Sequence, residues 1–237
     1  MGVDVFLIGP MLRDSWDDAT VATAHEALTS VGIESTSDRD GEVACEITAD
    51  EDGYSSSGTS YATIPEFTER LYNAKSGDIH YEFESERLRV THRSSAEFGS
   101  CPIPVRLGGL NAHFFDTQNS DEDTVDRRTE KLYEVFYRLA EAIDPDVASL
   151  LLWNDHGRTD MIPEVTIPSE HDMNALPWLL LLSESWIDYC GGRERVRQAP
   201  VYDVRSLDTG SMILRVKERP SINGCRYDSG FDYLFDS

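Results

Sequence analysis

The amino-acid sequence predicts an α+β fold, with a mixed sheet and helices packed on it. Three observations carry this prediction. Apolar runs of strand length alternate with stretches of helical spacing, as expected of a sheet covered by helices. Two hairpin signals interrupt that alternation and require antiparallel neighbours, so a wholly parallel sheet is not expected. Hydrophobic residues make up 40% of the 237 residues, which is enough for a core.

The first half of the chain is predicted to open with a strand and a helix. Residues 3–8 form an apolar run typical of a buried strand, and the helix that follows ends at Gly32. Residues 42–48 predict a second strand. The stretch 49–63 is rich in Ser, Gly and Asp, and it predicts a mobile loop.

A short helix over residues 65–74 then leads into a hairpin. Apolar residues alternate with polar ones on both sides of a turn near Ser85, from residue 79 to residue 90. The segment 103–115 contains another strand, whose glycines at 108 and 109 indicate a bulge.

The second half contains the clearest helix, over residues 124–143, with one apolar stripe and an acidic start. A core strand is predicted at 147–153 and a helix at 177–190. A second hairpin is predicted over 201–217, and the aromatic tail from residue 221 is expected to pack on the body.

Domain organisation has two open alternatives. The order of elements allows two similar, ferredoxin-like halves, 1–118 and 119–237. Because no sequence repeat links them, a single continuous domain is equally compatible with the sequence.

The charge balance indicates where the protein works. The chain has 44 acidic residues and a formal net charge of −23, and Lys75, Lys131 and Lys217 are its only lysines. Such a charge repels itself in dilute buffer, whereas at molar salt the Debye length falls to about 3 Å. An acid-rich, lysine-poor chain is typical of salt-adapted proteins. We therefore predict a cytoplasmic protein of an extreme halophile.

The same features exclude several classes. A strongly acidic chain repels phosphate, so no nucleic-acid partner is expected. The longest apolar run, 176–182, is far shorter than the ~20 residues of a membrane helix, so no membrane span is expected. A secretory signal is not expected either, because no basic stretch precedes the first apolar run. The four cysteines form no C-x-x-C pair and are expected to be reduced.

Candidate metal ligands lack a ligand spacing. Asp155 and His156, with His171 nearby, are interpreted as an exposed loop rather than a metal site. His113 and Asp116 are expected at a strand end, with their side chains on opposite faces.

Other candidates also have simpler interpretations. His80 and His92 are predicted as a solvated pair on the polar face of the first hairpin. Residues 50–53 resemble only part of a calcium loop. Cys190 could act as a nucleophile with His156 as base, but its position at the end of an amphipathic helix favours a structural role. No catalytic, cofactor or metal residue is assigned.

One segment reverses the sign of the charge. Residues 191–219 carry six arginines and one lysine against four carboxylates, whereas residues 1–60 carry two arginines against 13 acidic residues. The arginines of 191–219 can pair with the acidic half of the chain, or they can contact an acidic partner. Both alternatives are open. The candidate partner-binding residues are Arg193, Arg195, Arg197 and Arg205.

The same segment carries a resemblance. A stretch predicted as a helix from Pro177, a Gly-Gly-Arg-Glu-Arg turn at 191–195, an Ala-Pro-Val-Tyr strand at 199–202 and an apolar strand ending near Pro220 follow one another. This succession resembles the C-terminal segment of a family of immunity proteins from polymorphic toxin systems. The resemblance implies binding and neutralisation of a cognate toxin, without catalytic residues.

The predicted function is therefore protein binding, with toxin immunity as its most specific form. Two alternatives stay open: an enzyme with a dispersed active site, and a housekeeping protein. A binder is expected to expose an interface, whereas an enzyme is expected to have a concave pocket with convergent titratable groups.

Overall fold

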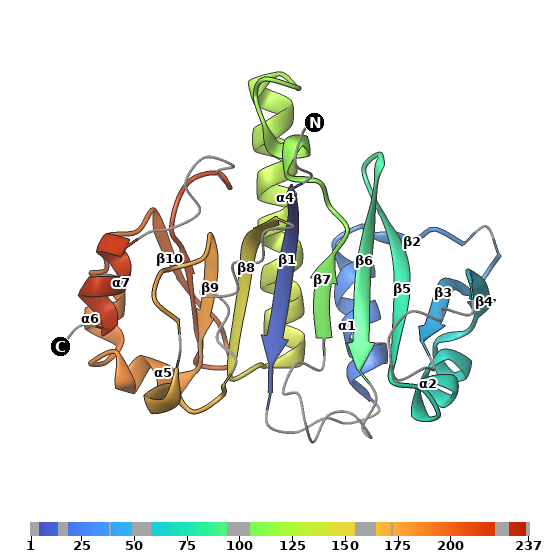
Figure 1. The fold of residues 1–237 in the computed structure, drawn as a ribbon, viewed down its shortest axis with the longest axis horizontal. Coiled ribbons are helices and arrows are strands. Elements are labelled where there is room, and N and C mark those ends of the chain that lie inside the picture. The colour runs from blue at the N-terminus through green and yellow to red at the C-terminus, as the bar shows by residue number, and fades with distance from the viewer. Residues whose placement is uncertain are drawn as a thin grey trace.

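The computed structural model describes residues 5–13, 19–37, 39–48, 58–93, 105–154, 165–171, 173–220 and 228–235. One eleven-stranded sheet runs through the whole of it (Figure 1). The α+β class is confirmed. Every strand pair among these residues is antiparallel. The prediction of a mixed sheet is therefore wrong.

The first strand lies in the middle of the sheet. Strand β1 (Val5–Leu12) pairs with β7 (Val105–Gly108) on one side and β8 (Val147–Asn154) on the other. Beyond β7 follow β6 (Glu86–Arg93), β5 (Ser76–Phe83), β3 (Val43–Thr48) and β4 (Ser60–Ala62), with β2 (Glu34–Ser35) also on β5. Beyond β8 follow β9 (Leu179–Leu182), β11 (Met212–Arg215) and, at the edge, β10 (Asp203–Ser206).

The helices form two groups. The first contains α1 (Ala19–Ser30), α2 (Ile64–Tyr72) and the long α4 (Glu122–Ile143). The second contains α5 (Glu184–Tyr189), α6 (Arg193–Arg197) and α7 (Asp228–Phe235), at the C-terminal end of the sheet (Figure 1). Two 3₁₀ helices, Ala112–Phe115 and Pro168–Glu170, lie in connections.

Alternation along the strands divides the apolar side chains between two cores. Leu179 and Leu181 belong to the larger core, with residues of α1, α2 and α4, whereas Leu180 and Leu182 belong to a second core with residues of α5, α6 and α7. Because neighbouring side chains of a strand point to opposite faces, the two groups of helices cover opposite faces of the sheet. Burial on both faces explains the unbroken run of leucines in β9.

The strongest local signals are confirmed. Helix α4 begins at Glu122, two residues before the predicted start. The Asp121 side chain caps it by accepting a hydrogen bond from the Thr124 amide at 2.9 Å. Asp144 ends it in a left-handed conformation, with φ +50°. Both hairpins are present, as β5–β6 and β10–β11.

Two predicted elements are wrong. The segment 177–190 is not one helix, because Leu179–Leu182 is strand β9 and only Glu184–Tyr189 is helical. A short apolar run does not distinguish a buried strand from a buried helix by its period. In the predicted loop 49–63, residues Ser60–Ala62 form strand β4; residues 49–57 lie outside the described part.

The division near residue 118 stays a prediction, although β1 and β8 join the two predicted halves in one sheet. None of the helices in the described ranges is long and apolar enough for a bilayer crossing.

Candidate functional site

Three of the four predicted partner-binding arginines lie on the short helix α6, and two of them, Arg193 and Arg197, keep exposed side chains. Arg193 donates to Glu184 Oε1 at 3.0 Å, and Arg197 donates to Glu194 Oε1 at 2.7 Å. The side chains of Arg193 and Arg197 are nevertheless 38% and 51% exposed. Each therefore has an internal partner and remains accessible to an external one.

The other two are more closely bound to the body. Arg195 donates to the main-chain carbonyl of Tyr233 and lies over the Tyr233 ring, with its Cζ 5.5 Å from the ring centroid. Arg205, on β10, lies 3.4 Å over the Tyr137 ring and donates to Glu134 Oε2 at 3.3 Å. Arg205 therefore connects the edge strand to α4.

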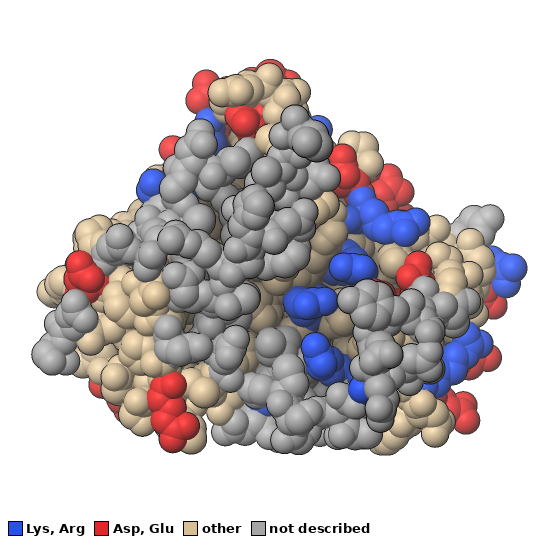
Figure 2. Space-filling model, viewed as in Figure 1, with Lys and Arg blue, Asp and Glu red and all other residues tan. Residues whose placement is uncertain are grey.

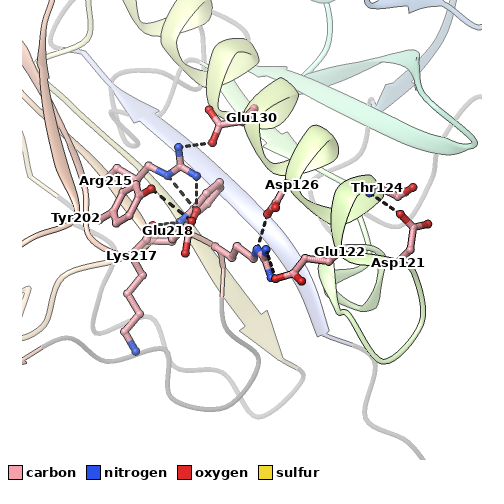
Figure 3. Close-up of polar contacts among 11 residues, drawn as sticks. Asp121, Glu122, Thr124, Asp126, Glu130, Tyr202, Arg215, Lys217 and Glu218 are labelled. Atoms are coloured by element: carbon pink, nitrogen blue, oxygen red, sulfur yellow. Dashed lines mark hydrogen bonds and ion pairs between the residues drawn. The ribbon is translucent and has the colours of Figure 1, made fainter.

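Arg215 is the most buried arginine of the segment, with a side chain only 6% exposed (Figure 3). Its Nη1 donates to Glu130 Oε1 at 2.6 Å, and its Nε and Nη2 donate to the main-chain carbonyl of Glu218. The guanidinium lies over the rings of Tyr133 and Tyr202, 5.2 and 5.1 Å from their centroids. Hydrogen bonds and aromatic contacts thus satisfy a buried charge.

Arg219 binds the start of α4. Its Nε donates to Asp126 Oδ1 at 2.5 Å and its Nη2 to Glu122 Oε1 at 3.0 Å. These two hydrogen bonds raise the pKa of Arg219 above the ordinary arginine value.

The carboxylates that bind these arginines form one row on α4. They are Glu122, Asp126, Glu130 and Glu134, spaced by four residues and therefore on one face of the helix. We call this row the α4 acidic row. It receives Arg219, Arg215 and Arg205 in turn. The internal-pairing alternative thus describes these arginines, with partners from α4 rather than from residues 1–60. Partner contact by Arg193, Arg195, Arg197 and Arg205 stays a prediction.

The prediction of a solvated His80–His92 pair is wrong. In the register of β5 and β6, His80 lies opposite Arg89 and His92 opposite Gly77. Each even-numbered residue of one strand pairs with an odd-numbered residue of the other, so the two histidines point to opposite faces. Both are buried, 3% and 0% exposed.

His92 lies inside the larger core. Its ring meets the Phe67 ring edge-on, with centroids 6.0 Å apart, and a Cβ at Gly77 would lie 2.7 Å from Phe67. Within the described ranges neither ring nitrogen has a hydrogen-bond partner. Burial, with a smaller contribution from His25, lowers the pKa of His92 to about 3.

This burial predicts a pH dependence. When burial lowers the pKa of a histidine in the folded chain, the free energy of unfolding is highest above about pH 6.5. It falls as the pH drops from there toward the folded pKa. In molar KCl, we expect the free energy of unfolding to fall between about pH 7 and pH 5, with up to about 1.4 kcal/mol per pH unit from His92. Denaturant titration of His92→Leu should show a shallower slope, while the exposed-site control His113→Leu should not. An unchanged slope in His92→Leu contradicts this.

Among the described residues, the neighbours of the His171 ring are aromatic. Its Nδ1 lies 3.2 Å from the Met173 carbonyl oxygen, and its ring lies 5.0 Å from the Phe235 ring. Asp155 and His156 lie outside the described residues. Across the described ranges, no three His, Cys, Asp or Glu side chains are placed to hold a metal.

The remaining candidates fall in other environments. His113 and Asp116 lie in and after a 3₁₀ helix rather than at a strand end, because the Asn111 side chain caps that helix through the His113 amide. Cys190 is buried, and burial raises the pKa of its thiol to about 12, which is opposite to the shift that activates a nucleophile. Residues 50–53 lie outside the described part.

Cys45 and Cys190 are free and buried. Cys101 and Cys225 lie outside the described residues, so the reduced state of all four cysteines stays a prediction.

A hollow of about 550 Å³ opens between α1 and strands β2 and β3. His25, Glu34, Arg39, Asp40 and Glu42 are its titratable lining. Arg39 is bound to Glu42 at 3.3 Å, and burial lowers the pKa of His25.

Sequence reasoning missed a second group of arginines, at alternate positions of the first hairpin and the strand after it. They are Arg87, Arg89 and Arg93 of β6 and Arg106 of β7, and we call them the outer arginine strip. The period of two in the sequence was the signal that could have found them.

The comparisons with known proteins give a fold. No protein-family model matches the chain, and no curated protein matches it. Among solved structures, the Pseudomonas aeruginosa T6SS protein PA0821 is similar, with a TM-score of 0.56 and 9% sequence identity. The match covers 97% of this chain and 71% of that one. At this identity, the similarity establishes a shared fold.

Proposed function

We propose that this chain is a protein-binding protein that neutralises a cognate toxin, as an immunity protein does. The agreement of two independent similarities carries the proposal. The sequence of residues 177–220 resembles immunity proteins of toxin systems, and the fold of almost the whole chain is shared with a protein named for a secretion system, the T6SS. One similarity is local and based on sequence; the other is global and based on fold.

The backbone of residues 177–220, which we call the family-like segment, supports the first similarity. Gly191 and Gly192 adopt φ of +90° and +96°, which L side chains rarely adopt, and they separate α5 from α6. Gly210, at φ +94°, closes the β10–β11 hairpin. The glycines that define the family-like pattern therefore stand where this backbone requires them.

The surface of the segment supports protein binding. Tyr189 and Tyr202 are 44% and 55% exposed, on the same segment as the exposed Arg193 and Arg197. Tyrosine and arginine are the residues enriched at protein interfaces and among their energetic hot spots. Such a surface acts by occupying its partner and needs no chemistry of its own.

Capture from the native host tests this function. The tagged chain, purified in molar KCl, is expected to retain one dominant partner protein. Truncating a central interfacial arginine typically costs ~2 kcal/mol or more, about 30-fold in affinity. We expect at least one of Arg193→Ala, Arg195→Ala and Arg197→Ala to weaken binding by that factor.

Arg138→Ala is the matched control, because Arg138 is 43% exposed, lies on α4 and is paired with Glu134 and Glu141. Equal recovery from all variants would place the interface away from α6. Capture of no partner by the unmodified chain would contradict the protein-binding function itself.

A further inference from the structure

The outer arginine strip lies on the face of the sheet opposite α1 and α4. Leu88 and Val90 of β6 and Leu107 of β7 belong to the larger core, which those helices cover. The alternate positions therefore point away from the helices, and they hold the four arginines, Thr91 and Gly108. No outward position of these two strands carries a carboxylate.

At this end of the sheet, no helix in the described ranges covers the outer face, whereas α5, α6 and α7 cover it at the C-terminal end (Figure 1). Figure 2 shows Lys and Arg side chains in a row down this face, over β6 and β7. The row stands out on a chain whose net charge is −23.

The strand register brings the guanidinium groups together. Arg106 pairs with Thr91, and so lies diagonally between Arg89 and Arg93 of the neighbouring strand. Diagonal neighbours in a sheet are ~7–8 Å apart, within reach of long side chains. Four like charges at this spacing oppose folding unless counter-charges meet them.

Carboxylates of the described part of the chain neutralise the strip only in part. Arg89 lies 3.6 Å from Asp78 Oδ2, and its side chain is still 45% exposed. Arg106 also interacts with another group of the chain, so it is not without a partner. Arg87 and Arg93 form no ion pair with the described part of the chain. The arginines of 191–219 differ, since the α4 acidic row and nearby carboxylates already bind most of them.

We propose that the outer arginine strip is the docking surface for a partner protein whose contact surface carries carboxylates. The inference rests on the proposed function and adds to the α6 surface a second contact surface on the same face of the sheet, together with its chemistry. Arginine binds carboxylates through two parallel hydrogen bonds. Such short contacts persist at molar salt, where a Debye length of ~3 Å removes long-range attraction.

Two other occupants fit less well. A second copy related by a two-fold axis would set the strip against itself, arginine facing arginine. A nucleic acid would meet the repulsion of a net charge of −23.

Chemical protection tests the surface without a known partner. The full chain in molar KCl is modified with phenylglyoxal, with and without poly-L-glutamate, and each arginine is quantified by peptide mass spectrometry. We expect poly-L-glutamate to slow modification of Arg87 and Arg89 at least fivefold more than that of Arg127 and Arg138, which are 58% and 43% exposed on α4. Equal protection overturns the proposal. Stronger protection by duplex DNA, or light scattering that shows a dimer lost on mutation of the strip, assigns another occupant and also overturns it.

Binding variants complete the test. With the captured partner, Arg87→Glu/Arg89→Glu should weaken binding at least 30-fold, while Arg127→Glu/Arg138→Glu, which changes the net charge equally, should alter it less than threefold. Circular dichroism checks that each variant folds, and Arg87→Lys/Arg89→Lys, which keeps the charge, should still lose affinity. Unchanged affinity in the reversal variant overturns the proposal. If no partner is captured while poly-L-glutamate protects the strip, the proposed function fails and the surface assignment stands.

Discussion

Arg215→Ala is expected to lower the free energy of unfolding by about 2–3 kcal/mol, since hydrogen bonds to a charged group contribute about 1.5–3 kcal/mol. Arg215 joins β11 to α4 through Glu130, binds the Glu218 carbonyl and lies over two tyrosine rings. Its removal leaves that carbonyl without its donors and leaves a void beside the rings. The measurement is denaturant unfolding in molar KCl.

Two further variants separate burial from charge. Arg127→Ala removes an exposed arginine bound to Glu84, and a surface pair contributes about 0–1 kcal/mol. Glu130→Gln should cost less than Arg215→Ala, because the amide oxygen can still accept the hydrogen bond from Arg215 and the side chain at this position is 61% exposed. A loss in Arg215→Ala no larger than that in Arg127→Ala would contradict a structural role for the buried guanidinium.

Stability is expected to rise by several kcal/mol between dilute buffer and molar KCl. Two like charges 10 Å apart in water repel by about 0.4 kcal/mol, and a chain with 44 acidic residues holds many such pairs. Molar salt screens nearly all of this repulsion. Chloride is preferable to sulfate, because sulfate also strengthens apolar burial.

The salt dependence has an internal control. As the pH approaches the sequence pI of about 4.4, the net charge vanishes and the salt slope should shrink. A denaturation midpoint that stays flat with KCl near pH 7 would remove the salt-adaptation interpretation of the sequence.

The elements that could be predicted from the sequence are those whose apolar residues recur with the period of a helix or a strand. Helix α4 combines a cap at Asp121 with an apolar stripe, and the hairpins alternate around short turns. Strand β9 could not be predicted, because burial on both faces erases the alternation that identifies a strand. The environment of His92 depends on strand register and on the missing side chain at Gly77, neither of which a local pattern contains.

The candidate site divides in the same way. The charge reversal in residues 191–219 was visible in the sequence, but its partners were not, since the α4 acidic row lies some 80 residues away along the chain. The spacing of that row by four residues was a local signal, and only the sheet order places β11 and β10 beside it. The outer arginine strip became evident once the faces of β6 and β7 were assigned.

Neutralisation of the captured partner is the most direct test of the proposed function. The partner protein is expressed in a salt-adapted host, alone and together with this chain, and growth is followed. We expect the partner alone to arrest growth and the unmodified chain to restore it, whereas Arg87→Glu/Arg89→Glu should fail to do so. A partner that leaves growth unchanged, or an arrest that the unmodified chain does not relieve, would contradict toxin immunity.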